Sequence, residues 1–425
     1  MTAEQATPSG LVRDVRPDFP ILATPLDGLT PVYLDNAATT HVPRQVLDAI
    51  CAYYSHDHSN VGRGVHTLGM RATQRFMRAR ERVRAFLNAP APTDVVFTKS
   101  ATEALNLVAQ GLGPKIVSAG DEVLISGLEH HSNLLPWRRL CERTGAVLKV
   151  AAVDEHGEVS LDSFRDRITD RTKLIALAHV SNVQGTVNPV REMTAEAHRR
   201  GILVVVDGAQ AVGHRSVDVT DLDADFYCFS AHKMYGPQGI GVLYGRSEHF
   251  ERMDPLLLGG GMAPLASYDG PILTRPPLEF EAGSPNIAGM VGVEAAIEYL
   301  DELGRDSVEA HDAGLAARAA EGLRSLGNVT VYGAQEPRGG ILSFNVDGVH
   351  ANDVGAHLNT FGIATRTGVH CASPFVDSLG LVGTVRASFG VYNTVEEVET
   401  LVDAVKTAQP GTWTKDHPGE RFLPD

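Results

Sequence analysis

The residue best suited to covalent chemistry is a lysine in an unusual setting. Lys233 follows the apolar run DFYCFS (225–230) and precedes the glycine- and proline-rich turn MYGPQGIG (234–241). A lysine at such a place is partly withdrawn from water, which lowers the pKa of its amine and suits it to form a Schiff base. A solvated lysine on a surface loop is the alternative for Lys233 taken by itself.

Two other residues favour the chemical interpretation. Asp207 closes the apolar run GILVVVD (201–207), and open α/β sheets bind ligands at the carboxyl ends of their parallel strands. An acid there can pair with a protonated pyridine nitrogen, which pyridoxal phosphate needs in order to act as an electron sink. His130, in EHHSN (129–133), is suited to stack on a flat ring or to move protons. A turn-capping aspartate and a turn histidine are the structural alternatives, but the three residues together indicate a pyridoxal phosphate site.

A cysteine near the C-terminal end is a candidate nucleophile. Cys371 lies in RTGVHCASP (366–374), a segment whose glycine and proline predict a loop. His370 and Arg366 beside it favour the reactive thiolate form. The other three cysteines occur in helical or strand contexts, and we expect them to be small buried hydrophobes: Cys51, Cys141 and Cys228.

Arg386 is a candidate for binding a substrate carboxylate. It lies in TVRASF (384–389), between small and apolar neighbours, at the start of a strand or a helix. A semi-buried arginine needs an anionic partner, and no acid lies near it in the sequence. A carboxylate gripped by the guanidinium fork would supply that partner. A structural ion pair with a distant Asp or Glu is the alternative.

Alternating strands and helices must position these residues. The predicted strands are DEVLIS (121–126), AVLKVAAV (146–153), KLIALAHV (173–180), GILVVVD (201–207), DFYCFS (225–230) and GIGVLYG (239–245), and the helices between them include 102–112, 132–144 and 190–200. This pattern predicts an α/β fold with a mostly parallel sheet covered by helices on both faces. A loop-rich stretch (255–286) and a long helix (290–304) follow. A smaller α+β unit comes last, with strands near 329–332 and 340–346 and helices near 352–361 and 395–408.

Composition narrows the class of protein further. The 425 residues carry 37 Lys and Arg against 52 Asp and Glu, a net charge of −15, which argues against broad binding to nucleic acid. No apolar run is long enough to span a membrane, and the first twenty residues lack the apolar centre of a secretory signal. Four cysteines without a CxxC pair predict neither a disulfide framework nor a zinc knuckle, and no metal site is expected. We therefore expect a soluble, cytoplasmic protein of several domains.

The whole sequence resembles fold-type I pyridoxal phosphate enzymes of the class V aminotransferase superfamily. More narrowly, it is similar to group II cysteine desulfurases of the SufS type, a group that also contains selenocysteine lyases. The resemblance runs from residue 18 to residue 394. It rests on YLDNAATT (33–40), NVGRGVHTLG (60–69), TEALNLVA (102–109), EHHSNLLPW (129–137), SNVQGTVNPV (181–190), DGAQ (207–210), SAHKMYGPQGIG (230–241), FEAGSPN (280–286), RTGVHCA (366–372) and RASFGVYNT (386–394).

The resemblance implies a role for each site residue. Lys233 would carry the cofactor, Asp207 would pair with its pyridinium, His130 would stack on the ring and Gln210 would bond the phenolic oxygen. The phosphate would be held by Thr102, Ser230, His232 and the start of the 102–112 helix, a natural anion site. Ala101 stands where such desulfurases often have a second threonine, so one phosphate bond is missing there. Ser284 would complete the phosphate site of a second subunit, which implies a homodimer.

The resemblance also implies the reaction and its partners. Asn182, Arg366 and Arg386 would bind the carboxylate of L-cysteine or a related amino acid. Cys371 would take the sulfur as a persulfide, L-alanine would be released, and the persulfide would pass to an acceptor protein. The seven-stranded sheet would belong to a large domain (31–287), with an N-terminal arm (1–30) packing on a small C-terminal domain (288–425) that carries the Cys371 loop.

Three positions depart from the SufS pattern. Val369 and Gly62 stand where histidines are usual, which would alter proton relay or substrate choice. Asn352 stands where members that use a zinc-containing, scaffold-like acceptor have a histidine, which weakens the expectation of that acceptor. These changes would suit a paralogue of a specialised pathway.

Three other functions remain open alongside the desulfurase. The first is a pyridoxal phosphate lyase of C–S or C–Se bonds, acting on selenocysteine, cysteine sulfinate or a cysteine S-conjugate, in which Cys371 is less important. The second is an aminotransferase or epimerase on the same fold, which has no need of Cys371. The third is a pyridoxal-binding regulator or interaction module.

Overall fold

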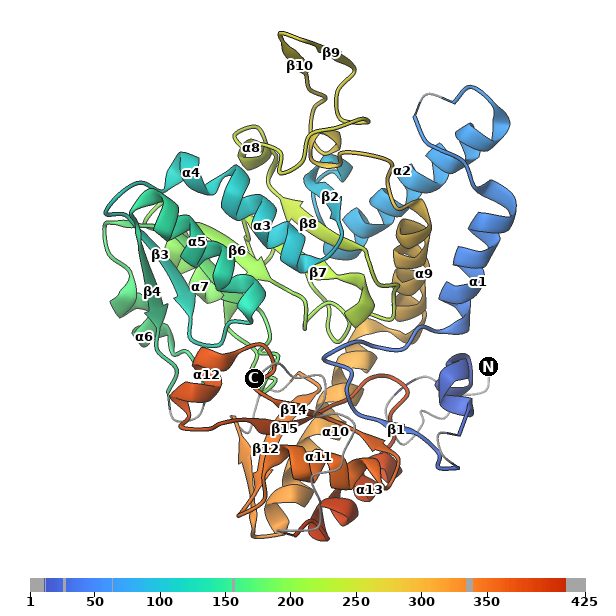
Figure 1. Ribbon diagram of the computed structural model, residues 1–425, viewed down its shortest axis with the longest axis vertical. Coiled ribbons are helices and arrows are strands. Elements are labelled where there is room, and N and C mark those ends of the chain that lie inside the picture. The colour runs from blue at the N-terminus through green and yellow to red at the C-terminus, as the bar shows by residue number, and fades with distance from the viewer. Residues whose placement is uncertain are drawn as a thin grey trace.

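The computed structural model describes residues 11, 13–25, 28–62, 64–154, 157–333 and 339–409. Figure 1 shows two lobes: a larger one built around an extended sheet, and a smaller one formed by the last third of the chain. The loop of Cys371 lies where the two lobes meet, just before the helix α12 (Ser373–Ser378). Among the described residues, no helix is both long and apolar enough to cross a membrane.

The large lobe contains a seven-stranded sheet, as predicted. Its strands, from one edge to the other, are β2 (Val95–Thr98), β8 (Gly241–Gly245), β7 (Phe226–Ser230), β6 (Leu203–Asp207), β5 (Thr172–Ala178), β3 (Glu122–Ser126) and β4 (Val147–Ala151). The five strands from β7 to β4 are parallel, whereas β8 runs antiparallel to both of its neighbours. All six strands predicted from apolar runs are present.

Helices cover both faces of this sheet because successive side chains of a buried strand point to opposite sides. Val205 packs in a core with α3 (Ala101–Gly111) and α5 (Leu135–Thr144). Its neighbours Val204 and Val206 pack instead with α2 (Thr67–Leu87), α7 (Val190–His198) and α9 (Ile287–Leu303). The remaining helices of this lobe are α1 (Arg44–Ala52), α4 (Gly113–Ile116), α6 (Leu161–Arg167) and α8 (Ser247–Phe250). The alternation explains the continuous apolar runs of the sequence.

The small lobe is a four-stranded antiparallel sheet with helices packed on it. The strand order is β11 (Val329–Tyr332), β12 (Ile341–Val346), β15 (Thr384–Ser388) and β14 (Arg366–Gly368), and the helices are α10 (Arg305–Ser325), α11 (Ala351–Asn359) and α13 (Val395–Lys406). β1 (Val32–Tyr33) joins this lobe by pairing in parallel with β13 (Ile363–Ala364). Arg386 lies in the middle of β15, so its segment is a strand rather than a helix.

The described part of the N-terminal arm contacts both lobes. Phe19 packs edge-on against Tyr299 of α9 and Tyr392, while Arg16 donates a 2.5 Å hydrogen bond to Glu397 of α13. Residues 1–10, 12, 26 and 27 of the arm, and 410–425 of the last domain, lie outside the described residues. The division into an arm (1–30), a large domain (31–287) and a small domain (288–425) therefore stays a prediction.

Candidate active site

A cavity of about 870 Å³ between the lobes brings most of the predicted site residues together. Its lining includes twelve of the thirteen: Ala101, Thr102, His130, Asn182, Asp207, Gln210, Ser230, His232, Lys233, Arg366, Cys371 and Arg386. The large lobe contributes its strand ends and the following turns, and the small lobe contributes β14, β15 and the Cys371 loop. Residues up to 349 positions apart in the chain, from Ala37 to Arg386, thus line one cavity.

Lys233 follows β7 in a single 3₁₀ turn (Ala231–Lys233) and faces this cavity. Burial lowers the pKa of its amine from 10.5 to about 8, against the opposing attraction of Asp207, and the positive charge of Arg386 lowers it further. A substantial fraction of such an amine is neutral near physiological pH. This is the condition for a lysine that attacks a carbonyl group, as the sequence predicted.

Asp207 lies at the end of β6, and His130 follows the end of β3. Strand β5 lies between these two strands in the sheet. Asp207 is the last residue of β6, only 7% exposed, and its Oδ1 accepts a 2.9 Å hydrogen bond from the Ala209 N–H. Burial raises the pKa of this carboxyl, and the charge of Lys233 opposes that rise. Burial also lowers the pKa of His130 to about 3, which leaves a neutral ring. Its Nδ1 accepts a hydrogen bond from the Ser132 N–H.

Small hydroxyl groups gather at the start of α3. Ser100 caps the helix, and the Thr102 hydroxyl lies 2.8 Å from that of Ser132. The Ala101 N–H donates to the Ser230 hydroxyl at 2.8 Å, so α3 is joined directly to the end of β7. A helix N-terminus with hydroxyls around it is a suitable place for a phosphate group.

Four polar atoms on residues of the cavity wall are buried and have no hydrogen-bond partner among the described residues. They are Gln210 Oε1, His232 Nδ1, His370 Nδ1 and Arg386 Nε. Leaving such an atom unpaired costs about 1–3 kcal/mol, and folded proteins rarely do so without a reason. A ligand that is both polar and anionic would satisfy them. Together with an amine, a buried acid and an anion-binding helix end, these atoms fit pyridoxal phosphate.

Arg386 and Arg366 share a resident acid that the sequence analysis missed. Arg366 grips Asp35 with two bonds, from Nε at 3.1 Å and from NH2 at 2.8 Å. Arg386, 2% exposed, reaches the same carboxylate at 3.3 Å and donates to the Asn182 carbonyl at 2.9 Å. The distant ion pair considered for Arg386 is therefore present. Two guanidinium groups against one carboxylate still leave one positive charge facing the cavity.

The Cys371 loop has an uncommon backbone. His370 and Cys371 are consecutive non-glycine residues with φ of 52° and 55°, a conformation that costs on the order of 1–3 kcal/mol each and persists only where the surroundings enforce it. The Asn182 side chain donates to the His370 carbonyl at 2.7 Å. Cys371 itself is exposed and lines the cavity.

The prediction that His370 favours the thiolate form of Cys371 was wrong. The ring is buried, which lowers its pKa to about 3, and its Nε2 lies 2.8 Å from the Thr384 hydroxyl. A neutral, internally bonded imidazole supplies no positive charge to Cys371. The cations that do interact electrostatically with Cys371 are Lys233, Arg366 and Arg386.

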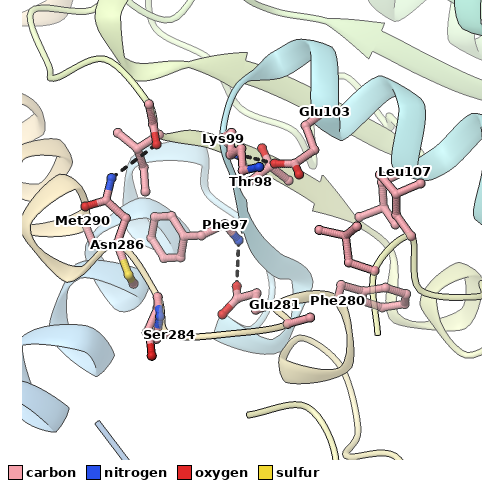
Figure 2. A pocket seen from close by; sticks show the side chains of 16 residues that line it. Phe97, Thr98, Lys99, Glu103, Leu107, Phe280, Glu281, Ser284, Asn286 and Met290 are labelled. Carbon is pink, nitrogen blue, oxygen red and sulfur yellow. Dashed lines mark hydrogen bonds between the residues drawn. The ribbon is translucent and has the colours of Figure 1, made fainter. Parts of the chain in front are cut away.

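Ser284 is the one predicted site residue outside this cavity. It lines a second pocket, shown in Figure 2, whose wall includes Phe97 and Glu281. Glu281 anchors the segment, since it accepts hydrogen bonds from the Phe97 N–H at 2.7 Å and from the buried Arg80. The role of Ser284 at the phosphate of a second subunit therefore stays a prediction.

The structure also locates the other cysteines and the three departures. Cys141 and Cys228 are buried as predicted, but Cys51 is exposed on α1, so that prediction was wrong. Asn352 and Val369 both line the cavity, and Val369 packs against the main core. Gly62 lies elsewhere, with a φ of 92° and its N–H bonded to the Thr73 hydroxyl.

Comparison with known proteins gives a consistent result. The model of the family "Aminotransferase class-V" matches residues 32–401. A relative from Vibrio cholerae named "Probable cysteine desulfurase" is 46% identical, over 93% of this chain and 97% of its own. The solved apo cysteine desulfurase of Thermococcus onnurineus superposes with a TM-score of 0.89 at 42% identity, covering 95% of this chain and 98% of that chain.

A second solved structure agrees. The Escherichia coli cysteine desulfurase CsdA, in its S-sulfonic acid form, gives a TM-score of 0.85 at 40% identity and covers 92% of this chain and 96% of that one. These matches extend over both lobes and the whole cavity. The chain therefore belongs to the class-V aminotransferase family, and within it to the cysteine desulfurases.

Proposed function

We propose that this protein removes the sulfur of L-cysteine, holds it as a persulfide on Cys371 and releases L-alanine. The observation that carries the proposal is that Cys371 lines the same cavity as Lys233, Asp207 and Arg386. The fold and the named relatives support pyridoxal phosphate as cofactor. When bound, it supplies an electron sink for the carbon that carries the substrate amino group.

The residues of the chain divide the remaining tasks. Lys233 carries the cofactor and moves the proton of the substrate α-carbon, for which its lowered pKa suits it. Asp207 would pair with the pyridine nitrogen, and the neutral His130 would stack on the ring. Gln210 takes the phenolic oxygen. The start of α3, with Thr102, Ser230 and His232, takes the phosphate.

Sulfur transfer involves residues of both lobes. Arg386, Arg366 and Asn182 orient the substrate carboxylate, with Asp35 bridging the two guanidinium groups. The Cys371 thiolate attacks the substrate sulfur, so that an S–S bond forms while the C–S bond breaks and its electron pair stays on carbon. That carbon takes up a proton and becomes the methyl group of L-alanine. An aminotransferase would have no use for a thiol at this place, and a C–S or C–Se lyase would depend on it less.

Assembly and partners extend the proposal. Leu257, which lines the Ser284 pocket, is 52% exposed and the adjacent Leu258 is 72% exposed, which supports a homodimer in which Ser284 reaches the other subunit's phosphate. We also propose an acceptor protein that takes the sulfur from the exposed Cys371. Four free cysteines fit a reducing compartment, which supports a cytoplasmic location.

The test is the mass of the Cys371 peptide after the pyridoxal phosphate-loaded protein meets L-cysteine without reductant. We expect the mass of one added sulfur atom on this peptide, removed again by a thiol. An unmodified Cys371 peptide alongside released alanine would contradict the proposal. The exposed Cys51 serves as an internal control for non-specific sulfur addition.

A further inference from the structure

The Cys371 loop packs against the main core through Val369 and Ala372, but the helix that follows it borders a cavity. On one side it continues into β14, and on the other into α12, which lies against the ends of β3 and β4 (Figure 1). Phe375 anchors α12 in the main core, yet a cavity of about 390 Å³ remains between this helix and the large lobe. The cavity is lined by Ser126, Glu129, Leu134, Val153, Phe375 and Leu379, among others. The packing of α12 is therefore incomplete on this side, and polar contacts contribute to holding the strained turn.

His131 makes the contacts that bracket Cys371. Its backbone N–H donates to the Cys371 carbonyl at 2.7 Å. Its ring Nε2 accepts a 3.2 Å hydrogen bond from the Ser373 N–H and lies 2.9 Å from the Ser373 hydroxyl. One residue of the large lobe thus binds the backbone at the nucleophile and again two residues later.

The segment around His131 also contacts the cofactor side of the cavity. His130 directly precedes it and lines the cavity, and Ser132 directly follows it and meets the Thr102 hydroxyl of α3. A single 3₁₀ turn (His131–Asn133) therefore links the ring-stacking histidine, the nucleophile loop and the phosphate end. Glu129 ties this turn to β5, because its carboxylate accepts hydrogen bonds from Asn133 at 2.6 Å and from the Ala178 N–H at 2.8 Å.

We propose that His131 is the positioning residue for the nucleophile: its two-point contact holds Cys371 in the cavity, against the strain of the turn, where the thiol can reach the substrate sulfur. This rests on the proposed function in that Cys371 is taken as the sulfur acceptor. The ring acts as a hydrogen-bond acceptor and touches no reacting atom. Loss of the contact frees the loop and slows sulfur transfer, while the steps at the substrate α-carbon continue.

The first measurement needs no activity. Amide hydrogen exchange is compared in wild type and His131→Phe, which keeps a ring but loses the acceptor nitrogen. We expect exchange at residues 370–376 to accelerate at least tenfold, with α3 unchanged. His357→Phe is the matched control, because the His357 Nε2 likewise lies 3.0 Å from a hydroxyl, that of Thr407, and joins α11 to the end of α13 rather than to the loop. Unchanged exchange in the Cys371 loop would overturn the proposal.

The second measurement separates positioning from general damage. With L-cysteine, His131→Phe should form the Cys371 persulfide at least tenfold more slowly, while exchange of the substrate α-proton with solvent stays within twofold of wild type. His131→Gln, whose amide oxygen can replace Nε2 as acceptor, should recover most of the rate. Ser373→Ala, which keeps the backbone donor, should give a smaller loss. Equal loss of both activities, or no recovery in His131→Gln, would overturn the positioning role.

The two hypotheses fail in different ways. If wild type forms no persulfide on Cys371, the proposed function is wrong, and hydrogen exchange still decides whether His131 holds the loop. If wild type forms the persulfide but His131→Phe forms it equally fast, the proposed function stands and the role of His131 is wrong.

Discussion

The NH2 group of Arg386 lies 3.3 Å from Oδ1 of Asp35, the acid that also binds Arg366. The pair is separated by 351 positions in the chain and joins β15 to the segment after β1. Because Arg386 keeps a buried Nε without a partner among the described residues, the guanidinium group can accept a second anion without giving up the first. The substrate carboxylate is the anion that the proposed reaction supplies.

Arg386→Gln should therefore weaken the use of L-cysteine specifically. We expect kcat/KM to fall roughly 10- to 100-fold, the value of one lost charge-assisted hydrogen bond. Most of the loss should be in KM. The comparison substrate is cysteamine, which lacks the carboxylate. The kcat/KM for cysteamine should be the same in Arg386→Gln as in wild type. Arg318→Gln, which removes an exposed ion pair with Glu399, is the control variant. Equal losses with both substrates would contradict carboxylate binding.

Ser284 should act across a dimer. Ser284→Ala subunits are mixed with Lys233→Ala subunits. If a site combines Lys233 of one chain with Ser284 of the other, each mixed dimer contains one site in which both residues are intact. We expect the affinity for pyridoxal phosphate to rise on mixing, as measured by the visible absorbance of the bound cofactor. Mixing with the double variant Lys233→Ala/Ser284→Ala should give no rise. An identical affinity in both mixtures would contradict a contribution from the second subunit.

The rate at which pyridoxal phosphate loads onto the apoprotein should depend on the protonation state of the Lys233 amine. Burial lowers the pKa of this amine to about 8, so the neutral, nucleophilic fraction grows as the pH rises through that value. We expect the rate of loading to rise about tenfold between pH 7 and pH 9 and then to level off. Free Nα-acetyl-lysine, with an ordinary pKa, should show no plateau there. A protein rate still climbing above pH 9 would contradict the lowered pKa.

A buried acid away from the active site should make stability depend on pH. Burial alone would raise the pKa of Asp225, but hydrogen bonds from His198, His249 and the Val204 N–H outweigh it and hold the pKa well below its usual value. The hydrogen bond that His198 donates to Asp225 in turn raises the pKa of His198. Asp225→Asn should lower the free energy of unfolding by about 3 kcal/mol near pH 6.

The sign of the pH dependence follows from these two shifts. The contribution of Asp225 is present above the ordinary carboxyl pKa and is lost only in strong acid. The contribution of protonated His198 is present below the ordinary histidine pKa and is lost as the pH rises through its raised value. The cost of Asp225→Asn, from urea unfolding, should therefore be smaller at pH 9 than at pH 6. Asp221→Asn, at an exposed pair with Arg191, is the control. A cost that grew with pH would be inconsistent with this account.

Runs of apolar residues predicted those elements of the fold that depend mainly on residues close together in the sequence. The strands of the large sheet were visible because strands buried on both faces are continuous apolar runs, and Asp207 stood out as an acid ending one of them. The edge strand β2 was missed, since its four residues follow a proline turn without a longer apolar run. The roles of Asp35 and His131 could not be seen, because their partners lie 331 and 242 positions away.

The central claim concerns one sulfur atom, and the most direct test is alanine released from L-cysteine under reductant. It compares the purified, cofactor-loaded protein with Cys371→Ala, and uses Cys51→Ala as the matched control for an exposed cysteine. We predict robust alanine release from wild type and Cys51→Ala and a loss of at least 100-fold in Cys371→Ala, while all three keep their visible cofactor absorbance. Alanine released at the wild-type rate by Cys371→Ala would contradict sulfur transfer through Cys371.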